Sequence, residues 1–267
     1  MTATEEEQAG GGRKAVYVYG ILPGDIEVEP GAAAGVGDPP GEIRVVRHRD
    51  LAALVSDVDL DRPLGRAEDL FAHEELLDAS AADIPVLPLR FGAVVANDDA
   101  VAEELLGPHY DEFADALEQL EGRTEFVVKG RYVEHAILRE VLAEQPEAAQ
   151  LNEEIKDKDP NATREQRMQI GEIVSSAIEA KRQADTQALG DALSGHVEAS
   201  VVRPPSHELD AVYAAFLVKT DNADALQQAV DQLANEWRDR MELRLLGPLA
   251  AYDFVGTAAP ADAAAGS

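Results

Sequence analysis

The sequence contains no cysteine, so disulfide bonds, thiolate metal sites and thiol catalysis are excluded. Long hydrophobic runs are also absent, because no stretch approaches the ~18 apolar residues of a membrane-spanning helix. The first 12 residues lack the basic and apolar regions of a signal peptide. The chain has 267 residues, enough for one large domain or two ordinary ones. We therefore expect a globular protein, and the cytoplasm is its simplest location.

Basic residues are scarce. The chain has 23 lysine and arginine residues against 52 aspartate and glutamate residues, a formal net charge of -29. Such a surface repels itself at low ionic strength and is screened at high salt. The composition favours a protein adapted to a high-salt cytoplasm, with an ordinary acidic cytosolic protein as the alternative. It argues against nucleic acid as a direct partner, because phosphate binding requires a basic surface.

Motifs of catalysis and ligand binding are missing as well. The sequence has no HExxH zinc motif, no GxSxG nucleophile elbow, no GxxxxGK[ST] phosphate loop and no DxDxDG calcium loop. Asp57, Asp59 and Asp61 alternate in a way that could suit a hard cation, but such spacing also arises by chance among 52 acids. The six histidines, His73 among them, are expected at the surface or partly buried. We predict no catalytic residue, cofactor or metal ion, and hence no enzyme.

The most apolar stretch runs from Ile84 to Val95. Its β-branched and aromatic residues favour an extended backbone. Pro85 and Pro88 each remove a hydrogen-bond donor, so full pairing along a central strand is not expected. The pattern predicts a short strand, a kink at Pro88 and a reversal of the chain at Gly92.

The rest of the first half alternates strands and helices. A strand at 15–22 carries two tyrosines on one face, which are expected to pack in the core, with an exposed docking surface as the alternative. A helix at 67–82 carries Leu70, Phe71 and Leu77 as its apolar stripe. The remaining expected elements are a hairpin of strands at 43–46 and 51–55 and helices at 100–106 and 109–120.

The second half begins at an expected boundary near Gly122. Its expected elements are a strand at 125–132, helices within 133–192, strands at 196–202 and 211–218, a helix from 221 or 222, and a strand at 241–246 that resumes at 251–255. This order is the ferredoxin-like split βαβ pattern, with its first crossover enlarged into a helical hairpin. The hairpin carries few apolar residues, so we expect it to be peripheral and not part of the core.

The expected fold class is therefore α+β with two domains. The first is an N-terminal α+β domain at 14–121. The second is a C-terminal ferredoxin-like domain at 122–256, with a long helical hairpin insertion at about 133–192. Residues 1–13 and 257–267 are expected to be disordered tails.

Four segments of the chain form a recognisable set. They are Tyr17-Val18-Tyr19-Gly20-Ile21, Val86-Leu87-Pro88-Leu89-Arg90-Phe91-Gly92, Val128-Lys129-Gly130-Arg131-Tyr132 and Gly247-Pro248-Leu249-Ala250-Ala251-Tyr252-Asp253-Phe254-Val255. In this order they resemble the GvpL/GvpF family of gas vesicle proteins over residues 15–256. The chain departs from the family pattern at two places that affect local contacts: Leu249-Ala250-Ala251 replaces an aromatic residue and prolines, and Gly130 follows Lys129.

The resemblance implies an accessory or minor structural protein of gas vesicle assembly, without known catalysis and with a two-domain α+β fold. It implies that the partners are the gas vesicle shell protein and other gas vesicle accessory proteins. Together with the acidic composition it points to the halophilic archaeal branch. The alternative is a ferredoxin-like small-molecule binder or enzyme, which would need a concave site with convergent polar groups.

Arg90 and Phe91 are the candidate partner-binding residues. Arg90 is the only charge in the apolar stretch, and it could anchor a carboxylate of a partner. The competing interpretation is an arginine at a strand end that reaches water or pairs with a nearby acid. For Phe91, core packing competes with partner contact. The surrounding acids would form a polar rim around such a docking surface.

Overall fold

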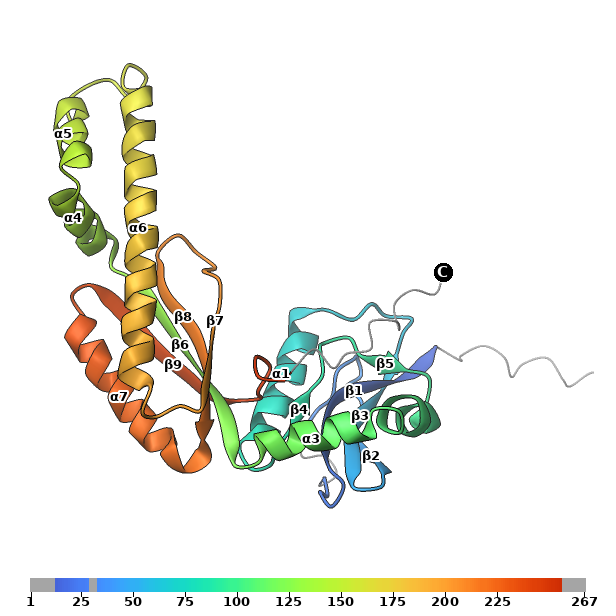
Figure 1. The fold of residues 1–267 in the computed structure, drawn as a ribbon. Coiled ribbons are helices and arrows are strands. Elements are labelled where there is room, and N and C mark those ends of the chain that lie inside the picture. Colours follow the sequence, from blue (N-terminus) through green and yellow to red (C-terminus); the bar gives the residue numbers. More distant parts are fainter. Residues whose placement is uncertain (1–12, 29–32, 256–267) are drawn as a thin grey trace, which may run out of the picture. The chain divides into compact units, whose positions relative to one another are not determined.

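The computed structural model describes residues 13–28 and 33–255, and the chain divides into two compact units. The first unit comprises Met1–Glu125 together with Gly247–Ser267, and the second comprises Phe126–Leu246. Each unit contains a β-sheet with helices packed on it (Figure 1), so the expected α+β class is confirmed. The expected disordered tails lie, apart from residue 13, outside the described residues.

The observed division differs from the one expected at 121/122, because the C-terminal segment belongs to the first unit. The Ala250 N–H donates a hydrogen bond to Asp78 Oδ1 at 2.8 Å, and Ala250 is fully buried. Tyr252 packs against the same core. The expected strand at 251–255 is wrong, because this segment forms a turn whose backbone-to-backbone hydrogen bonds are local.

The first unit is built around its N-terminal strand, which lies inside the sheet and is apolar on both faces. Its elements are β1 (Lys14–Pro23), β2 (Arg44–His48), β3 (Leu51–Asp59), α1 (Ala67–Ala81), β4 (Leu87–Pro88), β5 (Val94–Val95), α2 (Asp98–Ala100), a π-helix (Val101–Leu106) and α3 (Tyr110–Leu120). The sheet order is β2-β3-β1-β4, and β5 also pairs with β1. β1 and β3 are antiparallel, with an irregularity in register between Val18 and Gly20.

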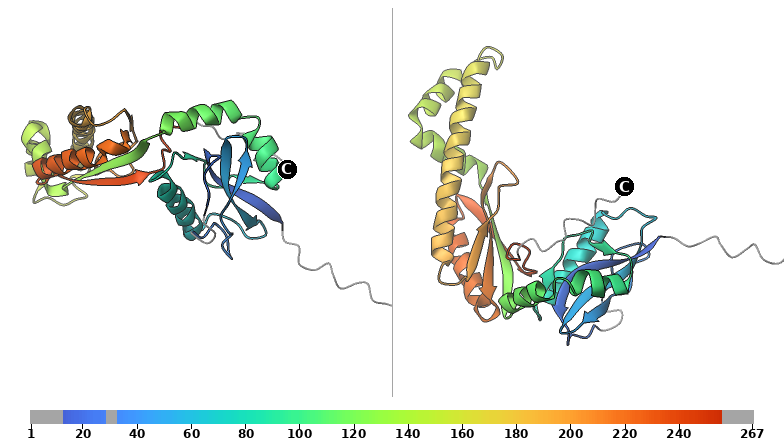
Figure 2. Two further views of the ribbon diagram at one scale, coloured as in Figure 1. Left: turned by 90° about the horizontal axis from the view of Figure 1, so that it is seen from below. Right: turned by 45° about the vertical axis from the view of Figure 1, so that its right-hand side comes forward.

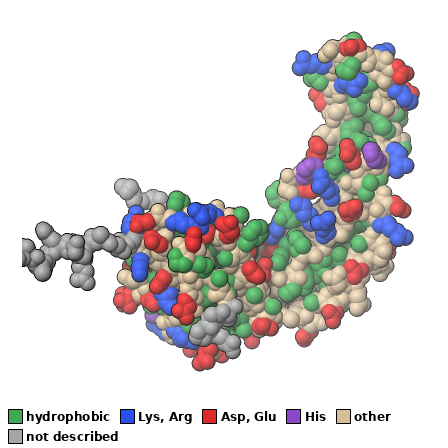
Figure 3. Space-filling view, turned by 180° about the vertical axis from the view of Figure 1, so that it is seen from behind, with side chains coloured by type: hydrophobic (Ala, Val, Ile, Leu, Met, Phe, Trp, Pro, Cys, Tyr) green, Lys and Arg blue, Asp and Glu red, His purple; other side chains and the backbone are tan. Residues whose placement is uncertain are grey.

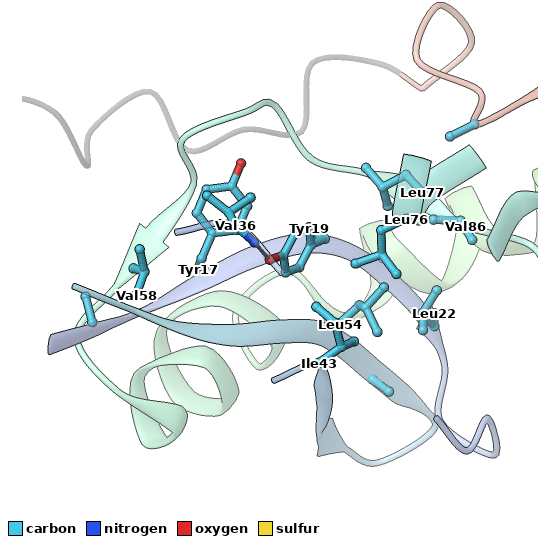
Figure 4. Packing of buried hydrophobic residues seen from close by; sticks show 13 residues of the cluster. Tyr17, Tyr19, Leu22, Val36, Ile43, Leu54, Val58, Leu76, Leu77 and Val86 are labelled. Carbon is cyan, nitrogen blue, oxygen red and sulfur yellow. Dashed lines mark hydrogen bonds between the residues drawn. The ribbon is translucent and has the colours of Figure 1, made fainter. Parts of the chain in front are cut away.

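Two hydrophobic cores cover the two faces of β1. On one face, Tyr17 and Tyr19 pack with Leu77 of α1, and the Val36 N–H donates to the Tyr19 hydroxyl at 2.7 Å (Figure 4). On the other face, side chains of β1 pack with the π-helix and with Phe113 of α3. The predicted core packing of the two tyrosines is therefore confirmed.

Helix α1 buries a different face from the predicted one. Leu70 and Phe71 are 40% and 67% exposed, so two of the three predicted stripe positions are wrong. The buried residues of this helix are Asp69, His73, Leu76 and Leu77. They share one helical face. Burial of Asp69 is possible because its carboxylate accepts the backbone N–H groups of Gly65 and Arg66, so its polar atoms are satisfied.

The second unit has the ferredoxin-like element order, and its sheet has the order β7-β8-β6-β9. Its elements are β6 (Arg123–Tyr132), α4 (Glu134–Glu144), α5 (Pro146–Ile155), α6 (Arg164–Leu193), β7 (Ala199–Val202), β8 (Asp210–Lys219), a 3-10 helix (Thr220–Asn222), α7 (Ala223–Trp237) and β9 (Met241–Leu249). Helices α6 and α7 lie on the same side of the sheet (Figures 1 and 2).

The helical insertion is peripheral only in its middle. Leu189 and Leu193, near the end of α6, are fully buried in the core over the sheet, as is Ile137 of α4. The expectation of a hairpin outside the core is therefore wrong at both ends. Between these ends α5 packs alongside α6 (Figure 1), and few side chains are buried. No helix within the described ranges is long and apolar enough to cross a membrane.

An ion network ties the base of the insertion to the sheet. Arg240 donates from Nη1 to Asp185 Oδ1 and from Nε to Glu140 Oε2, both at 2.7 Å. The Tyr132 hydroxyl donates to the other oxygen of Asp185. Lys181 Nζ donates to Glu140 Oε1 at 2.6 Å. The network joins β6, α4 and α6, so it fixes where the insertion leaves the ferredoxin-like core.

Candidate functional site

The apolar stretch around Arg90 lies alongside β1 and forms two short strands joined by a turn. β4 pairs with β1 at one end of the stretch and β5 pairs with it at the other. Between them the Leu89 N–H donates to the Tyr19 carbonyl and the Val18 N–H donates to the Ala93 carbonyl, both at 2.9 Å. Residues 90–92 are left to project from the strand, and we call them the 90–92 turn.

The strand, the end of β4 at Pro88 and the chain reversal agree with the sequence prediction. Gly92 has φ +92°, in the left-handed region that favours glycine, and no atom lies within 4 Å of where a Cβ would stand. Its N–H donates to the Tyr17 hydroxyl at 3.0 Å. The turn is therefore held by a backbone conformation that glycine supplies and by one hydrogen bond from the core.

Phe91 lies over a buried aromatic group. Its ring centroid is 5.8 Å from that of Tyr17 and 5.6 Å from that of His73. The Tyr17 hydroxyl lies 3.0 Å from His73 Nδ1, and the His73 ring stacks on Tyr19. Phe91 itself is half-buried. Part of the Phe91 side chain thus packs against the core, and the rest is exposed on the first unit.

His73 is buried, contrary to the expectation for the histidines. Burial lowers the pKa of His73 to about 4, and burial raises the pKa of Tyr17. Both rings are therefore uncharged at neutral pH, so the 90–92 turn packs on a buried aromatic group that carries no charge. The sequence signal that could have found His73 is its spacing from Leu76 and Leu77, three and four residues away on one helical face.

Arg90 is exposed, and within the described residues it makes no hydrogen bond or ion pair. The expectation that it reaches water fits this position, whereas pairing with a nearby acid is not observed. The turn places an exposed guanidinium beside a half-buried aromatic ring. This arrangement can bind a carboxylate and an apolar side chain of another protein.

The first unit also exposes apolar side chains that the sequence prediction had assigned to its core. Phe71 and Leu70 point outward from α1, and Phe71 is the more exposed of the two. No sequence motif marks these two residues. They are exposed because α1 buries the face that carries Asp69 and His73 instead. They are additional candidate contact residues, which sequence reasoning missed.

The alternating aspartates are engaged in local contacts. Asp57 pairs with Arg44 at 2.8 Å, and Arg44 also reaches Asp98 at 2.6 Å. Asp59 Oδ1 accepts the Asp61 N–H at 2.9 Å. Among the residues that the structure describes, no group of three histidine, aspartate or glutamate side chains is placed to hold a metal ion.

Two open hollows of about 570 and 760 Å³ flank α6 in the second unit. Arg182 lines both, but its guanidinium already donates to the carbonyls of Asp210 and Glu208 at 2.7 and 2.9 Å and pairs with Glu179. The main cation of these hollows is thus committed to internal contacts. The Arg182 guanidinium is therefore not available to a small-molecule ligand in either hollow.

Comparisons with known proteins all identify gas vesicle proteins as similar to this chain. Residues 15–256 match the sequence model of the family described as gas vesicle synthesis protein GvpL/GvpF. The chain is 36% identical over 241 residues to gas vesicle protein F of Streptomyces sp. (strain CB03234), covering 90% of this chain and 98% of that protein. It is 26% identical over 241 residues to gas vesicle protein F of Dolichospermum flosaquae, with 90% and 96% covered.

A solved structure shares the fold. The crystal structure of the gas vesicle protein GvpF from Anabaena sp. PCC7120 aligns with a TM-score of 0.73 and 24% identity, covering 91% of this chain and 98% of that chain. At that identity the likeness supports the fold alone. The sequence matches extend across both units, from β1 to the segment that follows β9.

Proposed function

The chain belongs to the gas vesicle synthesis protein GvpL/GvpF family, and on this premise we propose that it is a non-enzymatic assembly factor or minor component of gas vesicles. The observation that carries the proposal is the family match over residues 15–256. The partners that we propose are the gas vesicle shell protein and other gas vesicle accessory proteins. A shell subunit with an apolar face aggregates unless that face is covered before assembly, and an acidic partner could keep the complex dispersed.

We place partner docking on the first unit, at the 90–92 turn. Arg90 would bind a carboxylate of the partner, and the exposed edge of Phe91 would contact an apolar side chain. Three facts support this placement: the guanidinium is exposed, it is uncommitted among the described residues, and the turn is tied to β1 by hydrogen bonds. A preorganised turn loses little conformational freedom on binding.

The test uses the full chain, because the C-terminal segment packs into the first unit and a fragment ending at residue 121 would lack it. Tagged protein is captured from vesicle-forming cells, and the co-purified shell protein is quantified. Arg90→Glu should reduce recovery of the shell protein by about tenfold, since it replaces an attraction with a repulsion. Lys14→Glu, an exposed reversal on the same unit, is the matched control and should bind normally.

Two results would oppose the proposal. Equal recovery with both variants would remove the 90–92 turn from the binding surface. Absence of every gas vesicle protein from the captured material would oppose the assembly role itself. Circular dichroism of each variant shows whether the fold is retained, so a loss of binding is attributed to the surface only when the spectrum is unchanged.

The acidic composition supports a further part of the proposal, namely that the protein is adapted to high salt. A haloarchaeal source is not supported by the comparisons, because the relatives described above come from Streptomyces and Dolichospermum flosaquae. The proposed adaptation therefore rests on the charge of -29 alone, and the salt dependence of folding tests it.

A further inference from the structure

The sheet of the second unit has two different faces. Phe126 and Val128 of β6, together with Phe216 of β8, share a core with Leu189 of α6 and Leu226 of α7. Because side chains alternate along a strand, the residues between them point to the opposite face. We call this opposite face the free sheet face. Val127 and Ala215, at its centre, are buried. The face comprises Val127, Lys129, Arg131, Ala199, Val201, Arg203, Tyr213, Ala215, Leu217, Lys219, Glu242, Arg244 and Leu246.

The register of the strands supports this assignment. On β7, Val201 pairs with Ala215, and the Arg203 N–H donates to the Tyr213 carbonyl at 2.8 Å. On β9, Leu243 and Leu245 pack on the helical side, so the residues on either side of them face away. The free sheet face thus draws residues from all four strands or their ends.

Basic side chains are concentrated on the free sheet face. It carries five lysine and arginine residues and one glutamate in a chain whose formal charge is -29. Arg131 and Arg244 are exposed. Lys219 pairs with Glu198 at 3.3 Å, and Lys129 Nζ lies 4.0 Å from Asp210 Oδ2, so neighbouring acids partly compensate these two charges. Figure 3 shows basic and hydrophobic side chains close together on the second unit. From the overall composition, acidic side chains would be expected to outnumber basic ones on any large surface of this protein, and on this face they do not.

An aromatic ring lies among these charges. Lys129 Nζ is 4.9 Å and Arg203 Cζ is 5.2 Å from the centroid of the Tyr213 ring. Arg203 Nη1 also donates to the Tyr213 hydroxyl at 3.0 Å. These cation–π contacts hold the two cations in place beside the ring. Half-buried Leu217 and the 48%-exposed Leu246 add apolar area on the same face.

We propose that the free sheet face is a second docking surface, and that its occupant is an acidic segment of a protein partner, with carboxylates interspersed with aliphatic side chains. The exposed Arg131 and Arg244 bind the carboxylates, and Leu217 and Leu246 receive the aliphatic side chains. The site is separate from the 90–92 turn, which lies on the other unit.

The charge distribution selects this occupant. A basic patch attracts an acidic partner at short range, while the remaining acidic surface repels one at long range, so the contact is specific to a segment that fits. A second copy of the chain would bring another net charge of -29 and is disfavoured. A nucleic acid strand would meet strong repulsion from the rest of the protein for the same reason.

The test measures binding of the full chain to two labelled synthetic peptides by fluorescence anisotropy at about 0.1 M salt. Both are amphipathic peptides with the same leucine positions, and their polar positions are glutamate in one and lysine in the other. The glutamate peptide should bind, and Arg131→Glu/Arg244→Glu should weaken it by about tenfold or more. Lys156→Glu/Lys158→Glu makes the same change in net charge on the exposed end of the helical insertion and should leave binding unchanged.

Several outcomes would overturn the proposal. One is equal weakening by both double variants, which would show an effect of net charge and not of the surface. Another is tighter binding of an oligonucleotide than of the glutamate peptide. A third is a dimer that Arg131→Glu/Arg244→Glu dissociates, seen by sedimentation, because the occupant would then be a second copy. Failure of the glutamate peptide to bind the wild-type chain would also overturn it. Fluorescence of Trp237, which packs in the second unit, verifies folding of each variant.

Discussion

Protonation of His73 should destabilise the first unit as the pH falls. The imidazole is 2% exposed and its pKa in the folded chain is about 4, against 6.5 for the free side chain. Because the folded-state pKa is lowered, the neutral ring contributes full stability above about pH 6.5, and this contribution is lost as the pH falls toward 4. Linkage gives a loss of about 2 kcal/mol between pH 7 and pH 5.

The assay is urea unfolding followed by pulsed hydrogen exchange and mass spectrometry of peptides from β1. This readout is needed because the single tryptophan, Trp237, lies in the second unit and does not report on the first. In His73→Asn the amide group lies within hydrogen-bond reach of the Tyr17 hydroxyl, as Nδ1 does in the wild type, but the amide cannot titrate. The variant should lose about 2 kcal/mol less than wild type between the two pH values.

His135→Asn is the matched control, since His135 is exposed, and it should keep the wild-type pH dependence. The comparison between variants cancels the contribution of the many carboxylates, which titrate in all three proteins. If wild type and His73→Asn lose the same stability, or if the His73 ring titrates near pH 6.5 by NMR, burial does not depress its basicity and the reasoning fails.

Three other perturbations probe the second unit and the charge. Asp185→Ala leaves Arg240 without one of its two carboxylate partners, so the free energy of unfolding should fall by about 3 kcal/mol. Urea titrations followed by Trp237 fluorescence measure this change, and an unchanged value would show that the ion network is dispensable. Replacing residues 146–176 by a short Gly-Ser linker should leave the second unit folded, because Glu144 and Lys181 are in contact at 2.6 Å and the ends are close. A Trp237 spectrum of an unfolded chain would place this segment in the core. Circular dichroism should show cooperative unfolding at molar KCl and reduced cooperativity at ~0.1 M, where screening extends over ~10 Å; identical transitions would refute adaptation to salt.

The arrangement of strands could be predicted where a short run of β-branched and aromatic residues is bounded by clear turn residues. The central strand at 15–22, the reversal at Gly92 and the ferredoxin-like order of the second half follow from such local signals. Each depends on residues within a short window, so no tertiary information is needed.

Side-chain burial was harder to predict wherever a polar residue finds partners far away in the sequence. Asp69 is buried on α1 because backbone donors satisfy its carboxylate, and His73 is buried beside it with Nδ1 next to the Tyr17 hydroxyl. Leu70 and Phe71 are therefore at the surface. A hydrophobicity pattern assigns the opposite face. The return of the C-terminal segment to the first unit also depends on distant contacts, as between Ala250 and Asp78. The exposure of Arg90 is settled by geometry, while its role stays a prediction.

The return of the C-terminal segment has a consequence for the order of folding during synthesis. Residues 126–246 form a unit that is contiguous in sequence, so it can be completed soon after its last strand leaves the ribosome. The first unit begins with the first strand of the chain but includes Ala250 in its core. Its apolar surface around Tyr17 and Tyr19 therefore stays partly exposed until nearly the whole chain has been synthesised. The N-terminal unit is thus expected to be the last to mature, and it is the one that needs protection from aggregation on the ribosome.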